Sequence, residues 1–137
     1  MTTVLFACVH NAGRSQMAAA LFNLEADPTK AQAISAGTQP GPHVHPVVGD
    51  AMRELGVDLS HVKPQLLTDD LARQARYLIT MGCGDACPVV PGATRDDWPL
   101  EDPKGQSIER VREIRDEIRA RVRRFVRASG WAAAGKE

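Results

Sequence analysis

The sequence has no excess of either charge and no long apolar run. Its 137 residues include 17 basic and 17 acidic side chains, so the formal net charge is zero. A balanced charge gives no electrostatic reason to expect a nucleic-acid or membrane-surface partner. No apolar stretch approaches the length of a membrane span, and the first residues lack the pattern of a signal peptide. We therefore expect a cytoplasmic protein that binds neither nucleic acid nor membrane.

Cysteine is also scarce. The three residues are Cys8, Cys83 and Cys87. An odd number of thiols in a reducing compartment argues against a structural disulfide framework. His43 and His45 lie in a proline-rich turn without a cysteine pair in zinc-finger spacing nearby, so we interpret them as loop residues. The thiols are expected to take part in chemistry, and no metal site is predicted.

The stretch that organises the chain begins at Cys8. It follows the apolar residues 4–7 and precedes a helix-forming run that starts at Gln16, a pattern typical of a strand, a tight loop and a helix. Successive N–H groups in such a loop form an anion nest, and the helix N-terminus adds partial positive charge. The glycine and lysine spacing of a nucleotide-binding P-loop is missing. The stretch therefore predicts an oxyanion site beside a thiolate.

The polar residues of this stretch have distinct expected roles. The positive field stabilises a thiolate on Cys8, which makes it a nucleophile at neutral pH. The guanidinium fork of Arg14 can take two oxygens of the anion, Ser15 can donate to the thiolate, and Asn11 tolerates a positive φ. The residues expected to bind the oxyanion are His10, Asn11, Ala12, Gly13, Arg14 and Ser15.

Apolar patterns divide the rest of the chain into strands and helices. A final helix begins near Ile108, and its apolar side chains recur every three or four residues as far as Phe125. The other patterns predict strands at residues 2–7, 31–36 and 77–81 and helices at residues 15–26, 45–56 and 68–75.

This alternation predicts a single α/β domain over residues 1–137. We expect three layers, with a parallel sheet of about four strands and the active loop after the first strand. Residues 82–103 are rich in glycine, proline and aspartate and too long for an ordinary connection, so a functional segment is predicted there. Residues 128–137 are expected to form a frayed tail, with docking of Trp131 left open.

Residues 8–15 resemble the active loop of low-molecular-weight protein tyrosine phosphatases and of the arsenate reductases built on the same fold. The resemblance extends from Thr3 to about Val126, because further segments match in order and spacing: 35–37, 59–61, 80–81, 87–88 and 102–103. It implies the low-molecular-weight phosphatase fold. It also assigns the general acid to Asp102, in the Asp-Pro segment, with Asp96, Asp97 and Glu101 as alternatives.

The resemblance implies an arsenate reductase that uses all three thiols. Cys8 attacks arsenate, Cys83 attacks next as arsenite leaves, and Cys87 receives the disulfide, which thioredoxin then reduces. Only three residues separate Cys83 from Cys87, a spacing closer to reductases that use a low-molecular-weight thiol such as mycothiol and a glutaredoxin-like partner. Both reductants remain open. No bound cofactor is expected, phosphate and sulfate are expected to compete, and the protein is expected to be a monomer.

Two other functions fit the same loop. A phosphatase needs only the nucleophile, the arginine and the acid, but phosphatases of this type usually carry an aromatic residue after the Asp-Pro pair. Here Lys104 and Gly105 follow. A non-enzymatic redox sensor would bind an oxyanion without turnover and would need no proton donor, so Asp102 argues against it.

A last expectation concerns a cation. Some members of the family hold potassium beside the loop with two acidic side chains, an asparagine and a serine. Asn11 and Ser35 are present here. The two positions that are acidic in those members hold Ala19 and the stretch 63–65, which supply no carboxylate. Our hypothesis is that the Lys63 ammonium replaces potassium and steadies Asn11 directly.

Overall fold

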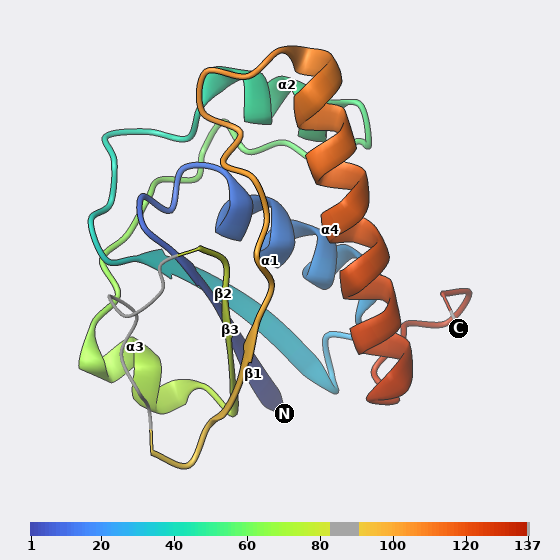
Figure 1. The fold of residues 1–137 in the computed structure, drawn as a ribbon. Helices are drawn as coiled ribbons and strands as arrows, with labels where there is room; N and C mark the ends of the chain where they lie inside the picture. The colour runs from blue at the N-terminus through green and yellow to red at the C-terminus, as the bar shows by residue number, and fades with distance from the viewer. Residues whose placement is uncertain (83–90, 137) are drawn as a thin grey trace.

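One four-stranded sheet carries the fold in the computed structural model, which describes residues 1–82 and 91–136 (Figure 1). Its strands run in the order β2-β1-β3-β4, and all neighbouring strands are parallel. The predicted parallel sheet of four strands is confirmed. The strand bounds are β1 (Thr2–Cys8), β2 (Ala31–Gly37), β3 (Tyr77–Thr80) and β4 (Thr94–Asp97).

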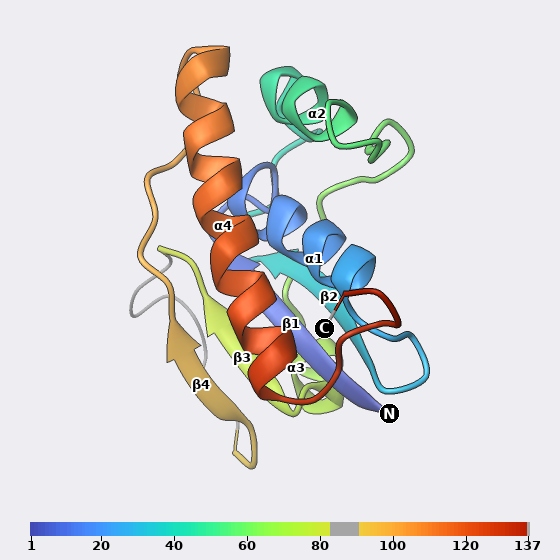
Figure 2. The same ribbon diagram turned by 90° about the vertical axis from the view of Figure 1, so that its right-hand side faces the viewer.

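Helices cover both faces of this sheet, which gives the three predicted layers. α1 and α4 lie on one face with α2 packed against α4, while α3 lies on the other face (Figure 2). The bounds are α1 (Arg14–Glu25), α2 (Pro46–Arg53), α3 (Asp69–Gln74) and α4 (Ile108–Ala128). Within residues 1–82 and 91–136, no helix combines the length and apolar character needed to cross a bilayer.

Strand β1 is buried on both faces because it lies between β2 and β3 under two helical layers. Val4 and Phe6 point into the larger core with α1 and α4, whereas Leu5 and Ala7 point into the smaller core beneath α3. Alternation of this kind explains why the strand appears in the sequence as an unbroken apolar run. It also fixes Cys8, the last residue of β1, at the carboxyl edge of the sheet.

Strand β4 was not among the predicted strands and lies within the segment 82–103. All four of its residues are exposed, and it lies at the edge of the sheet beside β3. The Thr80 hydroxyl donates to Asp97 at 2.6 Å, and Trp98, 6% exposed, packs its ring at 5.5 Å from that of Phe6. An edge strand without apolar alternation gives no period-two signal, which is why the sequence did not predict it.

All six aromatic side chains of the chain pack into one cluster in the larger core. Neighbouring rings lie with their centroids 5.3–6.1 Å apart, mostly edge to face. Such pairs add stability beyond the area that they bury. The chain therefore keeps no phenyl, phenol or indole ring for a binding site. The members are Phe6, Phe22, Tyr77, Trp98, Phe125 and Trp131.

The segment after α4 differs from the frayed tail that we expected. Trp131 packs against Phe22 and Phe125, with ring centroids 5.9 and 5.3 Å away. Its carbonyl accepts from the Asp27 N–H at 2.7 Å, and the Ala133 N–H donates to the Glu25 carbonyl at 3.0 Å. These contacts fasten residues 131–133 to the end of α1.

Helix α2 is tied to α4 by a charged cluster around Glu54. The buried Arg115 donates to the Ala51 carbonyl at 2.8 Å and to the Glu54 carboxylate at 2.7 Å, and Arg112 binds the same carboxylate with two nitrogens. Hydrogen bonds from Arg112 and Arg115 lower the pKa of Glu54 to about 2. The cluster fixes α2, and with it the histidine-containing segment that leads into α2.

Replacing Trp131 tests whether the C-terminal segment contributes to the core. Trp131→Ala should lower the free energy of unfolding by about 2–3 kcal/mol, because it removes a partly buried indole from the aromatic cluster. Leu66→Ala, at a side chain that is 53% exposed, is the control and should change it by less than about 0.5 kcal/mol. Chemical denaturation measures both. If Trp131→Ala is as stable as the native protein, the C-terminal segment does not contribute to the core and the predicted frayed tail is correct.

Candidate active site

The candidate site lies at the carboxyl end of β1, where the chain order of the strands reverses. β2 lies on one side of β1 and β3 on the other, so the segments that follow these strands separate around the end of β1. In α/β sheets such a switch point forms a crevice for ligands. The loop of residues 9–13 fills this position and leads into α1, whose N-cap is Gly13 (Figure 1).

The Cys8 sulfur sits inside this loop and is only 2% exposed. Its Sγ atom lies 2.9 Å from the Ser15 hydroxyl and accepts from the Asn11 N–H at 3.3 Å. Asn11 has a φ of 51°, as its position in the loop predicted, and this turns its N–H toward the sulfur. The Asn11 N–H and the Ser15 hydroxyl thus both lie against the sulfur, close to the start of α1.

Asn11 is held on every side by hydrogen bonds. Its Nδ2 donates to the Ser15 hydroxyl at 2.7 Å. Its Oδ1 accepts from the backbone N–H of Gln65 and from the side chain of Gln16, both at 3.0 Å. The fully buried amide therefore has a partner on each of its polar atoms.

The hypothesis that Lys63 steadies Asn11 directly is wrong. Lys63 is exposed, and the Asn11 Oδ1 atom, the side-chain acceptor that an ammonium would need, already accepts two hydrogen bonds, from Gln65 and Gln16. A backbone N–H reaches this position because residues 65–67 run alongside the end of β2. There the Gly37 N–H donates to the Gln65 carbonyl at 2.9 Å, and the Gln65 side chain donates to the Ser35 carbonyl at 2.8 Å.

Arg14 lies between the loop and two other segments. Its Nη1 donates to the Leu100 carbonyl at 3.1 Å, and its Nη2 lies 3.7 Å from the Asp102 carboxylate. Gly82, with a φ of +94°, lies against the same guanidinium, and an added Cβ there would clash with Nη1. The guanidinium is thus fixed at the point where the end of β3 and the Asp-Pro segment meet the loop.

Asp102 is the carboxylate that the structure brings to the loop. It is partly exposed, pairs with Arg14, and accepts from the Lys104 N–H at 3.0 Å. Pro103 packs directly on Gly13, where an added Cβ would lie 2.6 Å from the proline Cγ. This close packing requires glycine at the N-cap of α1 and holds Asp102 above the loop.

The three alternative carboxylates are engaged elsewhere. Asp97 accepts from the Thr80 hydroxyl, and Asp96 accepts from the Trp98 indole at 3.0 Å. Glu101 binds Arg110 and accepts from Gln106, at the start of α4. Of the four candidates, Asp102 is therefore the one with a described contact to Arg14.

A cavity of about 290 Å³ borders the loop on the side of the histidines. The His45 N–H donates to the Ala12 carbonyl at 3.0 Å and the Gly41 N–H to the His10 carbonyl at 2.9 Å, which fastens residues 41–45 to the loop. Burial lowers the pKa of His45, an effect reinforced by Lys104 and opposed by Asp102. The described lining residues are His10, Ala12, Gly41, Pro42, His43, His45 and Lys104.

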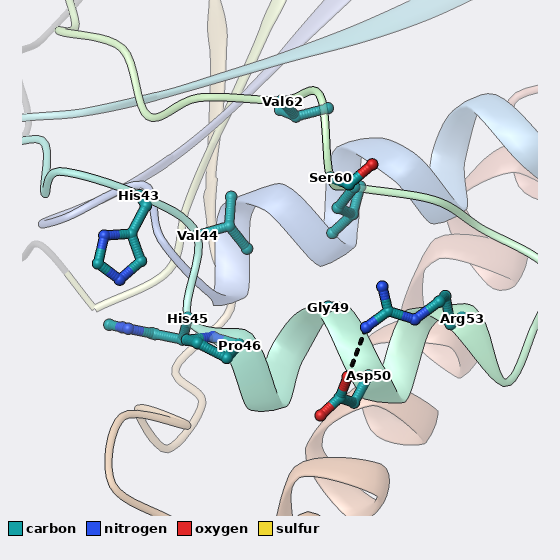
Figure 3. Close-up of a pocket in the computed structure, with 10 residues that line it drawn as sticks. His43, Val44, His45, Pro46, Gly49, Asp50, Arg53, Ser60 and Val62 are labelled. Carbon is teal, nitrogen blue, oxygen red and sulfur yellow. Dashed lines mark hydrogen bonds and ion pairs between the residues drawn. The ribbon is translucent and has the colours of Figure 1, made fainter.

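His43 and His45 also line a second pocket, shown in Figure 3. There His43 and His45 lie at the end of the pocket opposite the ion pair of Asp50 with Arg53. Nothing among residues 1–82 and 91–136 groups three or more potential metal ligands, and His43 and His45 lie in the loop before α2 as expected.

Cys83 and Cys87 lie in residues 83–90, outside the part of the chain that the structure describes. Their predicted roles stay predictions. The structure describes Gly82, the residue before Cys83. Gly82 lies against the Arg14 guanidinium.

One residue of the site was missed by the sequence analysis. Gln16 follows the Arg-Ser pair in the first turn of α1 and is buried, with its side chain turned toward Asn11. A polar residue in the first turn of a helix normally faces solvent, so its type and position gave no signal. Only the curvature of the loop brings the carbonyl and amide oxygens of Asn11 to it.

Comparison with known proteins agrees with this geometry. A family model described as low molecular weight phosphotyrosine protein phosphatase matches residues 3–134. A putative arsenate reductase of Halobacterium salinarum is 40% identical over 121 residues, 85% of each chain. Arsenate reductase 1 of Staphylococcus epidermidis is 35% identical over 127 residues, which cover 90% of this chain and 94% of that protein.

A solved structure of a thioredoxin-dependent arsenate reductase from Corynebacterium glutamicum superposes with a TM-score of 0.81 and 44% sequence identity. The superposition covers 93% of this chain but only 61% of that reductase. The family match extends over nearly the whole chain and includes the Cys8 loop and Asp102. Its relatives at 40% and 35% identity are a putative arsenate reductase and an arsenate reductase. The chain therefore belongs to the low molecular weight phosphotyrosine protein phosphatase family, as the resemblance of residues 8–15 indicated.

Proposed function

We propose that this protein reduces arsenate to arsenite, with Cys8 as the nucleophile. The observation that carries the proposal is the buried Cys8 sulfur in a loop flanked by Arg14 and Asp102. The Ser15 hydroxyl lies 2.9 Å from this sulfur, and the Asn11 N–H donates to it at 3.3 Å. The arsenate reductases among its relatives support the choice of substrate. The loop N–H groups and the Arg14 guanidinium hold the arsenate oxygens by charge and by hydrogen bonds.

In the first step the Cys8 thiolate attacks arsenic and a sulfur–arsenic bond forms. One hydroxyl group of arsenate leaves as water after it takes a proton from Asp102, and arsenic keeps its oxidation state of five. Expelling that oxygen without a proton is costly, so the acid contributes to the rate. Asp102 enters this step as the carboxylic acid and leaves it as the carboxylate, and Arg14, 3.7 Å away, holds it beside the loop.

In the second step the Cys83 thiolate attacks the Cys8 sulfur. The electron pair of the sulfur–arsenic bond goes to arsenic, which leaves as arsenite in oxidation state three, and a Cys8–Cys83 disulfide forms. The Cys87 thiolate then attacks the Cys83 sulfur and releases the Cys8 thiolate, leaving a Cys83–Cys87 disulfide. The position of Gly82 against Arg14 supports this route, since Cys83 is its neighbour in the chain.

Thioredoxin is the reductant that we propose for this disulfide. Its dithiol supplies two electrons and two protons and restores the Cys83 and Cys87 thiols. The support is the thioredoxin-dependent relative that is 44% identical, although this chain spans 61% of its length. A low-molecular-weight thiol, paired with a glutaredoxin-like protein, is the alternative, and the short spacing between Cys83 and Cys87 favours it.

A phosphatase acting on aryl phosphates is the second candidate, supported by the family match. Against it stands the use of all six aromatic side chains in the core cluster, which leaves none to hold a phenyl ring. The described lining of the cavity beside the loop consists of histidines, a lysine and small residues. These surroundings fit a small inorganic oxyanion better than an aryl ester.

Serine variants of the two outer thiols separate the relay from its alternatives. With arsenate and no external thiol, Cys87→Ser should form one arsenite per chain and stop at a Cys8–Cys83 disulfide, because only the last exchange is blocked. Cys83→Ser should form none, because no thiol attacks Cys8. Arsenite is quantified after a single turnover, and Cys8→Ser is the blank. Equal arsenite from Cys83→Ser and the native protein would exclude Cys83 as the second thiol.

Asp102→Asn tests the proton donor. Because the amide cannot supply the proton to the departing oxygen, kcat for arsenate should fall by about 10²-fold or more, with a smaller effect on binding. Glu101→Gln, at the neighbouring carboxylate that binds Arg110, is the matched control and should keep kcat within about threefold. If the two variants lose activity to the same extent, Asp102 is not the acid.

A further inference from the structure

We propose that Gln16 is a positioning residue for the nucleophile, one that sets the reactivity of Cys8 by holding Asn11 in its left-handed conformation. The described hydrogen bonds of Gln16 go to Asn11 and not to Cys8. It acts through the loop residue that supplies the donors to the sulfur. The inference rests on Cys8 being the nucleophile of the proposed function and adds a residue that governs it.

The orientation of the Asn11 side chain follows from its partners. The backbone N–H of Gln65, at 3.0 Å, can only donate, so the Asn11 atom that faces it must be the oxygen Oδ1. The amide nitrogen of Asn11 then faces Ser15 and donates to its hydroxyl at 2.7 Å. The donor and acceptor pattern therefore settles which way the buried amide points.

The same logic fixes the direction of the next hydrogen bond. Because the Ser15 oxygen accepts from Asn11, its own proton is free to point at the Cys8 sulfur, 2.9 Å away. A thiolate has no proton to give, so in the reactive state Ser15 is the donor. Asn11 thus serves the sulfur twice, through Ser15 and through its own N–H at 3.3 Å.

Both contributions depend on the φ of 51° at Asn11, a conformation that costs a non-glycine residue energy and persists only when its surroundings hold it. Gln16 provides that hold. Its Nε2 donates to the Asn11 backbone carbonyl at 3.1 Å and to the Asn11 Oδ1 at 3.0 Å. One amide group therefore fastens both the main chain and the side chain of the strained residue.

Gln16 is also placed to act rigidly. It is 4% exposed and lies in the first turn of α1, directly after Ser15. The same helix therefore carries both the Ser15 hydroxyl and the Gln16 amide that holds Asn11. Without the two hydrogen bonds from Gln16, the Asn11 peptide would be free to rotate. The Asn11 N–H and the Ser15 proton would then no longer point at the sulfur together.

The test measures Cys8 itself, without arsenate. In Gln16→Met, which keeps the length of the side chain but removes its donors, the rate of Cys8 alkylation by iodoacetamide should reach half its maximum at a higher pH. At neutral pH that rate should fall by roughly tenfold, the effect expected from a lost hydrogen bond to a charged group. Peptide mapping assigns the alkylation to Cys8 rather than to Cys83 or Cys87.

A second variant gives the clamp a distinct signature. In Gln16→Glu a carboxylate faces the two Asn11 oxygens, so alkylation at neutral pH should be slower than in Gln16→Met. As the new carboxyl group gains a proton at acidic pH and becomes a donor, the deficit relative to the native protein should shrink. A residue that merely fills space would not produce this pH-dependent recovery.

Asn23→Ala is the matched control, because Asn23 is an amide on the same helix that clamps a different segment. It binds Ala33 of β2 through two hydrogen bonds of 3.0 and 2.8 Å. This variant should lose thermal stability and keep the native alkylation profile. The proposal fails if Gln16→Met keeps that profile while it loses as much thermal stability as Asn23→Ala. Since alkylation needs no arsenate, a failure of the substrate assignment would leave this result standing.

Discussion

The site depends on one convergence of hydrogen bonds, in which Ser15 and the Asn11 N–H meet at the sulfur of Cys8. The strand, the helix and the side chains around the sulfur keep these donors in place. Strand β1, buried on both faces, fixes the sulfur at the edge of the sheet, and α1 begins within the same turn of chain. The tight loop requires a left-handed backbone at Asn11, and hydrogen bonds from Gln16 and Gln65 hold this residue in place.

Charged side chains border the loop that holds this sulfur. Arg14 and Asp102 form a pair where an oxyanion can be bound and a departing oxygen protonated. Lys104, which follows closely in the chain, lines the histidine cavity. The contact between Gly82 and Arg14 brings the end of β3, the residue before Cys83, to the same guanidinium.

Sequence patterns predicted the parts of the molecule that are governed by burial and by local backbone preference. The apolar run of β1, the N-terminal start of α1 and the positive φ of Asn11 are of this kind, and all three are confirmed. The edge strand β4 escaped prediction because backbone pairing holds it, and the anchoring of residues 131–133 because only tertiary contacts hold them. Lys63 was assigned by analogy with a cation site, whereas the position is filled by a backbone N–H and by the Gln16 side chain, neither of which a residue pattern encodes.

The most direct test of the account uses fully reduced protein, arsenate and no external thiol, with peptide mapping of the cysteines as arsenite forms. The account predicts one arsenite per chain together with a Cys83–Cys87 disulfide, because the electrons come from the chain's own thiols. The contradicting result is the absence of both arsenite and disulfide, with turnover only after a small thiol is added. That result would replace the internal relay with transfer to a low-molecular-weight thiol.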